Sequence, residues 1–270
     1  MFSFVIATFN SENYIDRCLQ SFLVQTYRDF ELVIIDGSSR DRTVEICKSY
    51  SDRLQMKIVS EPDEGIYDAW NKGIKICGGD WIAFLGSDDQ LQSKEALYLM
   101  AQITSGLQSS ISIVYGKVAL CENDAVIRTM GRDWSLQKAR LMLGEMIPHP
   151  GSLHRRTVFS NFGVFDQSFK ICGDLDLTLR VLKNTEAYFA NNFDYVLMDA
   201  QGVSNNLDRF HQSYKESKIA YRKNGILFTP FLYLYSVKKL VSSFIRLFFG
   251  DKSLKAFRSK FRRVIYKSKS

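Results

Sequence analysis

Short apolar runs alternate with helical patterns over the first 89 residues of this 270-residue chain. The runs stand within residues 2–10, 30–35, 56–60 and 81–89. Between them, apolar residues recur at helical spacing, as at Ile15, Leu19 and Phe22. Continuous apolar strands joined by helices are typical of a mostly parallel sheet. The pattern therefore predicts an α/β fold, with a mostly parallel central sheet flanked by helices.

Acidic residues stand where two of these predicted strands end. The run that begins at Trp81 stops at the adjacent pair Asp88 and Asp89, and the run over residues 30–35 stops at Asp36. Ligands of such sheets bind beyond the carboxyl ends of the strands. Burying an unpaired carboxylate is costly, and a divalent cation that carries a diphosphate removes that cost. The alternative is a solvated turn that caps the next helix.

Five motifs in a fixed order resemble those of family 2 glycosyltransferases. They are Ile6–Asn10, Ile35–Ser39 with Asp41 and Thr43, Glu61–Gly73, Gly79–Asp89 and Phe165–Arg180. Each is a weak signal alone, but five in order over residues 2 to about 183 are specific. The resemblance implies the GT-A nucleotide-diphospho-sugar transferase fold. The third motif is similar to that of enzymes that build bacterial cell-surface polysaccharides of the colanic-acid, O-antigen or capsule type.

The resemblance also implies a binding site for a nucleotide-diphosphate sugar. The residues it assigns to that site are Thr8, Asn10, Asp36, Asp68, Asn71 and Asp88. Asp36 would accept hydrogen bonds from the base or the ribose. Asp88 and Asp89 match the last two positions of the family's metal-binding acidic motif, and Asp89 is expected to ligate Mg²⁺ or Mn²⁺ directly.

Three further residues are expected at the reacting centre. Asp174 matches the acid usually taken as the catalytic base, and Asp176 lies two residues further on. His149 stands between two prolines that fix its loop, at a point where relatives often have a histidine beside the acceptor. The alternatives are a first-turn acid that stabilises a helix for Asp174, and no site role for His149.

The chain departs from the family's pattern at two positions. Gly86 stands where many relatives have another acid, and Trp70 stands where many have an arginine. Without that arginine, neutralising the diphosphate depends more on the metal and on other basic groups. Lys72 could supply positive charge, although a solvated helix face is the plainer interpretation.

Composition fits one soluble catalytic domain with an appendage. The hydrophobic content is 46%, enough to bury a full core. The five cysteines are scattered, with no Cys-x-x-Cys pair, which favours reduced thiols and a cytoplasmic protein. We expect no signal peptide, because the apolar start lacks a basic leader. The histidines and cysteines lack the spacing of a structural zinc site.

The last quarter of the chain has a different charge. Residues 205–270 contain 16 Lys and Arg against 3 Asp and Glu, a net charge of +13, so residues 1–204 carry −6 of the whole-chain +7. Two apolar runs, 226–237 and 240–249, are separated by Lys238 and Lys239. This pattern favours an interfacial helix on an anionic membrane over a spanning helix or a nucleic-acid site. The alternative is that the tail packs on the catalytic domain.

These observations predict a catalytic domain over residues 1–204 and a basic amphipathic helical tail over residues 205–270. The nucleotide-binding half would be 1–89 and the acceptor-side half 90–204. The expected function is that of a metal-dependent, inverting hexosyltransferase, peripheral on the inner face of the cell membrane. Its acceptor would be a lipid-linked or growing cell-surface glycan. The alternative is a noncatalytic membrane-associated nucleotide-sugar-binding or scaffold protein, and the joint presence of Asp174 and the acid pair favours the enzyme.

Overall fold

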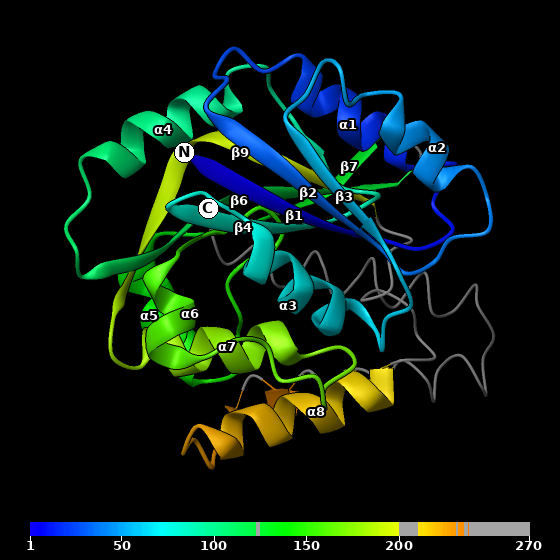
Figure 1. Cartoon of the computed structure of the whole chain (residues 1–270). Coiled ribbons are helices and arrows are strands. Elements are labelled where there is room, and N and C mark those ends of the chain that lie inside the picture. Colours follow the sequence, from blue (N-terminus) through cyan, green and yellow to red (C-terminus); the bar gives the residue numbers. More distant parts are fainter. Residues whose placement is uncertain (123–124, 200–209, 231, 235–236, 238–270) are drawn as a thin grey trace.

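The computed structural model describes residues 1–122, 125–199, 210–230, 232–234 and 237, and within them the strands form one curled sheet (Figure 1). The strand order is β3-β2-β1-β4-β8-β6-β9-β5, with β7 paired to β6. The strands of the first half are β1 (Phe2–Thr8), β2 (Phe30–Asp36), β3 (Met56–Ser60) and β4 (Trp81–Gly86). The later strands are β5 (Gln90–Leu91), β6 (Ile111–Glu122), β7 (Ala125–Met130), β8 (Leu153–Arg155) and β9 (Glu186–Asp199).

The first four strands pair in parallel, as the apolar runs predict. β1 lies between β2 and β4, and β2 pairs with β3. The register places Thr8 beside Asp36 and Ala7 beside Gly86. The carboxyl ends of β1, β2 and β4 therefore meet at one edge of the sheet, where the polar segments that follow them come together.

Beyond β4 the sheet is mixed rather than parallel. β8 pairs antiparallel with both β4 and β6, and β7 forms an antiparallel hairpin with β6. The long strand β9 returns parallel to β6 and antiparallel to β5. These pairings join distant parts of the chain, so no local repeat in the sequence indicates them.

Helices cover both faces of the sheet (Figure 1). One face carries α1 (Ile15–Leu23), α2 (Thr43–Lys48) and α4 (Ala96–Ser105), and the other carries α3 (Ile66–Ile76), α5 (Trp134–Met142), α6 (Thr157–Phe162) and α7 (Gly173–Leu182). Side chains alternate along each strand, so that Val5 packs in one core and Phe4 and Ile6 pack in the other. This double burial explains why the strands read as continuous apolar runs. The five cysteines, all within the described part, form no disulfide.

The start of α1 differs from what the sequence predicts. Asn10 and Ser11, which follow the first apolar run, are residue types that predict an N-cap, but the helix begins at Ile15 and no side chain caps it. A turn precedes it, in which the Ser11 carbonyl accepts from the N–H groups of Tyr14 and Ile15. The Asn10 side chain instead accepts from the Arg40 N–H at 3.0 Å. Asn10 thus ties the loop after β1 to the loop after β2.

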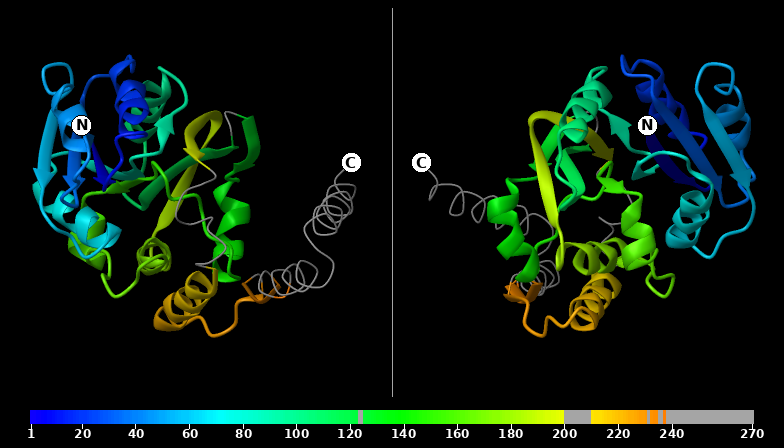
Figure 2. Two further views of the ribbon diagram at one scale, coloured as in Figure 1. Left: turned by 90° about the vertical axis from the view of Figure 1, so that its right-hand side faces the viewer. Right: turned by 60° about the vertical axis from the view of Figure 1, so that its left-hand side comes forward.

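Helix α8 (Phe210–Lys223) packs beside α7 (Figure 2). The Glu216 carboxylate accepts from the backbone N–H groups of Lys170, Ile171 and Cys172 at 3.1, 2.8 and 3.0 Å. Tyr221 is buried and donates to the Leu141 carbonyl at 2.9 Å. The described start of the expected tail therefore belongs to the packed core.

Part of the apolar run after α8 lies on the surface. Leu227 and Phe228 are 83% and 75% exposed, whereas Leu232 is buried against the loop after α5. Residues 238–270, which carry most of the expected basic tail, lie outside the described residues. Among the helices that are described, none is both long and apolar enough to cross a membrane.

Candidate active site

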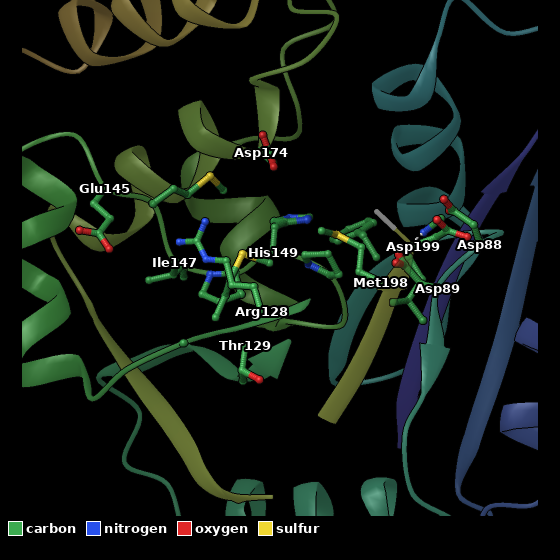
Figure 3. A pocket seen from close by; sticks show the side chains of 18 of the residues that line it. Asp88, Asp89, Arg128, Thr129, Glu145, Ile147, His149, Asp174, Met198 and Asp199 are labelled. Carbon is green, nitrogen blue, oxygen red and sulfur yellow. Dashed lines mark hydrogen bonds between the residues drawn. The ribbon is translucent and has the colours of Figure 1, made fainter. Parts of the chain in front are cut away.

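Two cavities adjoin at the carboxyl ends of β1 and β4. The first encloses about 490 Å³ and is lined by residues 7–11 and by Tyr14, Asp63 and Ser87 among others. The second encloses about 480 Å³ and is shown in Figure 3. The residues that line both are Ile66, Gly86, Asp88 and Asp199. The shared wall makes them two compartments of one cleft.

Asp88 belongs to this shared wall, and its neighbour Asp89 lines the second cavity. Asp89 is 5% exposed, and its carboxylate accepts from the Gly86 N–H at 2.8 Å. Burial, followed by the charge of Asp88, raises the pKa of Asp89 to about 8. Burial also raises the pKa of Asp88, and the nearby Asp199 adds to the effect on both. Desolvated acids that repel one another are a setting that a divalent cation relieves.

Oxygen donors of this kind suit Mg²⁺ and Mn²⁺. Within the described residues, no three histidine, cysteine or acidic side chains are arranged to hold a metal ion by themselves. The residues fit a cation that takes two protein carboxylates and completes its coordination with other oxygens. Such a partial protein site is usual for Mg²⁺ bound with phosphates.

Gly86 leaves room for this arrangement. A Cβ at residue 86 would lie 2.6 Å from Oδ1 of Asp88, so any side chain there would displace the Asp88 carboxylate. Gly86 therefore leaves the space that the Asp88 carboxylate occupies.

Asp174 lies in the first turn of α7 and lines the second cavity. Its carboxylate accepts from the Leu175 N–H at 2.8 Å and lies 3.2 Å from the Tyr67 hydroxyl. That hydroxyl also donates to the Ile171 carbonyl at 2.6 Å, which fixes the ring. Burial raises the pKa of Asp174 to about 6, so the side chain is an acceptor for a proton near neutral pH.

Asp176 points the other way. Residues two apart on a helix face roughly opposite sides, and Asp176 is fully buried beneath α7. Its carboxylate accepts from Arg180 Nε at 2.9 Å and from Asn224 Nδ2 at 3.0 Å. It lines neither cavity, and its contacts join α7 to the segment after α8.

His149 lies in the wall of the second cavity (Figure 3). It stacks on Trp70 with ring centroids 5.2 Å apart, and burial lowers its pKa to about 3, so the ring is neutral. Its Nε2 has no hydrogen-bond partner among the described residues. Trp70 thus replaces the expected arginine with an aromatic surface, and His149 can offer a hydrogen bond but no charge.

The residues expected around the donor divide into two groups. Thr8 and Asn10 line the first cavity. Asp36, Asp68 and Asn71 line neither one. The Asp36 carboxylate accepts from Ser60 Oγ at 2.6 Å and from the N–H and hydroxyl of Ser39.

The other two donor-side expectations have structural partners as well. Asp68 forms an ion pair with Lys72 at 3.2 Å, so the Lys72 charge is already balanced. Asn71 exchanges two hydrogen bonds with the backbone of Phe165, at 2.8 and 3.0 Å. These contacts join α3 to the segment that leads to α7.

The cavities also contain residues that the sequence did not single out. Asp199 ends β9 and lines both cavities, and Asp63 lines the first. Asp199 follows the run Tyr195–Met198 and so has the same strand-end signal as Asp36. Arg128 of β7 and Arg132 line the second cavity, and no local pattern marks them.

The model of the family "Glycosyl transferase family 2" matches residues 3–153. The chain belongs to this family. A PGL/p-HBAD biosynthesis glycosyltransferase of Mycobacterium bovis is 31% identical over 188 residues, which are 68% of this chain and 70% of that protein. Chondroitin synthase of Escherichia coli is 26% identical over 66% of this chain but only 26% of its own length.

Solved structures agree on the fold. S. aureus TarS 1–349 in complex with UDP-GlcNAc has a TM-score of 0.66 at 20% identity, over 81% of this chain and 66% of that one. The mannosyltransferase PcManGT from Pyrobaculum calidifontis, in complex with GDP-Man and Mn²⁺, has a TM-score of 0.65 at 13% identity, over 99% of this chain and 81% of that one. This chain thus spans about two thirds of the TarS fragment. The α/β class and the GT-A fold expected from the sequence are confirmed.

Proposed function

We propose that this protein is an inverting glycosyltransferase that moves a sugar from a nucleotide diphosphate to a lipid-linked or growing cell-surface glycan. One observation carries the proposal: the adjacent acids Asp88 and Asp89 and the separate acid Asp174 line the same cavity from different elements. Transfer of this kind needs negative charge neutralised on the leaving group and a proton removed from the acceptor. The two sets of carboxylates match those two needs.

The nucleotide would occupy the first cavity, with its diphosphate at the shared wall beside Asp88. Asp89 and Asp88 would hold Mg²⁺ or Mn²⁺ there. The cation would supply positive charge against the diphosphate as the bond to the sugar breaks. Thr8 and Asn10 would contact the nucleotide, because both line the first cavity. The complexes of TarS with UDP-GlcNAc and of PcManGT with GDP-Man and Mn²⁺ support a donor of this class.

Asp174 would act as the general base. It lines the second cavity but not the first, so it faces the acceptor rather than the nucleotide. Its pKa of about 6 leaves it ionised near neutral pH but still basic enough to take a proton. A base on the side away from the leaving group implies a single displacement, with inversion at the anomeric carbon. His149 would donate or accept one hydrogen bond at the cavity wall without carrying charge.

A surface beside the second cavity supports contact with a membrane. Gly144, next to the lining residues Glu145 and Met146, packs closely on Leu232 of the segment after α8. Four exposed apolar side chains belong to the same segment: Leu227, Phe228, Tyr233 and Leu234. We propose that they meet the inner face of the cell membrane, where a lipid-linked acceptor could enter the cavity. The basic residues between 205 and 270 would add attraction to anionic lipids.

The experiment that tests the proposal compares Asp174→Asn with Asp176→Asn. First, UDP-, GDP- and dTDP-sugars are screened for hydrolysis with Mn²⁺ and Mg²⁺. With the best donor, Asp174→Asn should lower kcat by about 10²- to 10⁴-fold while nucleotide affinity is kept. Asp176→Asn should mainly lower the free energy of unfolding, because it breaks a buried contact with Arg180. Binding without turnover by the unchanged protein would favour the noncatalytic alternative.

A further inference from the structure

The two ends of the second cavity carry opposite charge. Asp88 and Asp199 lie at the wall shared with the first cavity, and Asp89 lines the second cavity next to Asp88. Arg128 and Arg132 lie in the wall formed by β7 and the loop that follows it. Figure 3 shows Arg128 between Glu145 and His149, and Asp174 points toward the same cavity. The proposed function uses the acidic end to hold the cation, and it does not involve the two arginines of the basic end.

The negative charge of Glu145 is already paired. Its Oε1 lies 3.2 Å from Arg132 Nη2, and its Oε2 lies 2.5 Å from Arg140 Nη2. Arg140 Nε also donates to Oε2 at 2.7 Å. By contrast, the Arg128 side chain forms no ion pair or hydrogen bond with any other described residue. A guanidinium with five unused donors therefore faces the cavity.

An exposed arginine on an edge strand is usually only solvated. The surroundings of Arg128 differ from that case, because its cavity is walled nearby by Met130, Met146 and Ile147. Apolar walls lower the local dielectric and strengthen an ion pair formed there. The planar guanidinium also matches the two oxygens of a carboxylate or phosphate group. The basic end is suited to an anion.

We propose that Arg128 binds an anionic group of the acceptor. The inference rests on the proposed function, in which the acceptor occupies the second cavity to reach Asp174. The donor diphosphate does not meet this need, because Arg128 is absent from the walls of the first cavity. The anion is either the carboxylate of an acidic sugar in the glycan or the phosphate that links the sugar to its lipid. Both present the same pair of oxygens.

The test measures the binding of probes that differ in charge, by calorimetry with the best-binding nucleoside diphosphate and Mn²⁺ present. The probes are octyl glucoside, octyl glucuronide and farnesyl-diphosphate-linked N-acetylglucosamine. Arg128→Gln should weaken binding of one or both anionic probes by roughly 10- to 100-fold and leave octyl glucoside unchanged. Arg128→Lys should recover part of the loss, since lysine keeps the positive charge but lacks the planar pair of N–H donors. Arg28→Gln, at an exposed arginine in neither cavity, is the matched control.

The pattern of losses identifies the source of the anion. A loss confined to the glucuronide points to an acidic sugar, and a loss confined to the diphosphate probe points to the lipid linkage. An equal change for the neutral and anionic probes, or no change at all, would overturn the inference. Weaker binding of the nucleoside diphosphate itself would place Arg128 at the donor instead and would also overturn it. Failure of the proposed function is distinct, since it would appear as a lack of turnover by the unchanged protein.

Discussion

At the scale of single residues, burial raises the pKa of both Asp88 and Asp89. Asp89 is almost fully buried and its pKa rises to about 8, so at neutral pH the protein without metal disfavours its charged form. Among the described residues, the Gly86 N–H is the hydrogen-bond donor to the Asp89 carboxylate. A bound cation would favour ionisation and so reverse this effect.

The metal role gives a prediction for Asp89→Asn. This change should abolish metal-dependent turnover and weaken binding of the nucleotide sugar, because the amide has lost the charge that holds the cation. Folding should be kept, since the amide oxygen can still accept from the Gly86 N–H. Turnover with Mn²⁺, turnover in excess EDTA and thermal unfolding are the measurements. Asp88→Asn should have a smaller effect, and full activity in EDTA would exclude a metal requirement.

Asp174 gives a second prediction, in the pH dependence. The carboxylate must be ionised to act as a base, so kcat/KM should fall as the pH drops through about 6. A helix-capping acid would stabilise the fold when it ionises, and the raised pKa of Asp174 predicts the opposite effect on the free energy of unfolding. Because the folded pKa lies above that of the unfolded chain, ionisation destabilises the fold as the pH rises from about 4 to 6.

Asp174→Asn should therefore be as stable as the unchanged protein at pH 7, or more stable by about 1–2 kcal/mol. Denaturant unfolding at pH 4 and pH 7 measures the difference, which should shrink at the lower pH. Lower stability of the variant at pH 7 would support the alternative in which Asp174 serves only to stabilise the first turn of α7.

At the scale of elements, α8 acts on the site through α7. Glu216 places a carboxylate at the N-terminus of α7, where three backbone N–H groups would otherwise lack an acceptor. Asp174 lies in the first turn of that helix. The position of the expected base thus depends on a helix about 40 residues further along the chain.

Glu216→Ala should lower the free energy of unfolding by about 2–3 kcal/mol, because it leaves buried N–H groups unpaired. Lys215→Ala on the exposed side of the same helix is the matched control and should change it by less than about 0.5 kcal/mol. Chemical denaturation measures both. If the two variants were equally stable, α8 would not be an integral part of the domain.

At the scale of the whole molecule, the exposed apolar residues after α8 and the second cavity lie on adjoining parts of the structure. The segment that follows α8 (Figure 2) packs through Leu232 on the loop after α5, and its residues Leu227 and Phe228 are exposed. Truncation before this segment would also remove the buried Leu232, so exposed positions are the better sites for a test.

Leu227→Glu combined with Phe228→Glu should reduce cosedimentation with anionic vesicles and reduce transfer to a vesicle-embedded acceptor. Donor hydrolysis should persist, because neither side chain lines a cavity. Val24→Glu, at another exposed apolar residue, is the control. Binding of the unchanged protein should weaken as salt rises, since charges are screened within about 10 Å at 0.1 M salt. Equal cosedimentation of all three proteins would show that this segment is not the anchor.

The sequence by itself determined the first half of the fold. Apolar runs and helical spacing are local, and they anticipated β1–β4, α1 and α3 within a few residues. The same patterns placed Asp36 and the pair Asp88 and Asp89 at strand ends, because these acids come directly after the apolar runs. The order of the motifs was enough to give the family.

Only the tertiary structure decided which of these residues share a cavity. Asp174 and Asp176 are alike in sequence, but helix geometry turns one into the cavity and buries the other against Arg180. The Asp36 side chain accepts from Ser60, 24 residues away, and the Asn71 side chain donates to the backbone of Phe165, 94 residues away. Arg128 lines the second cavity because β7 pairs with β6, which in turn pairs with β8. Contacts over such separations depend on how the whole sheet closes, which no local pattern records.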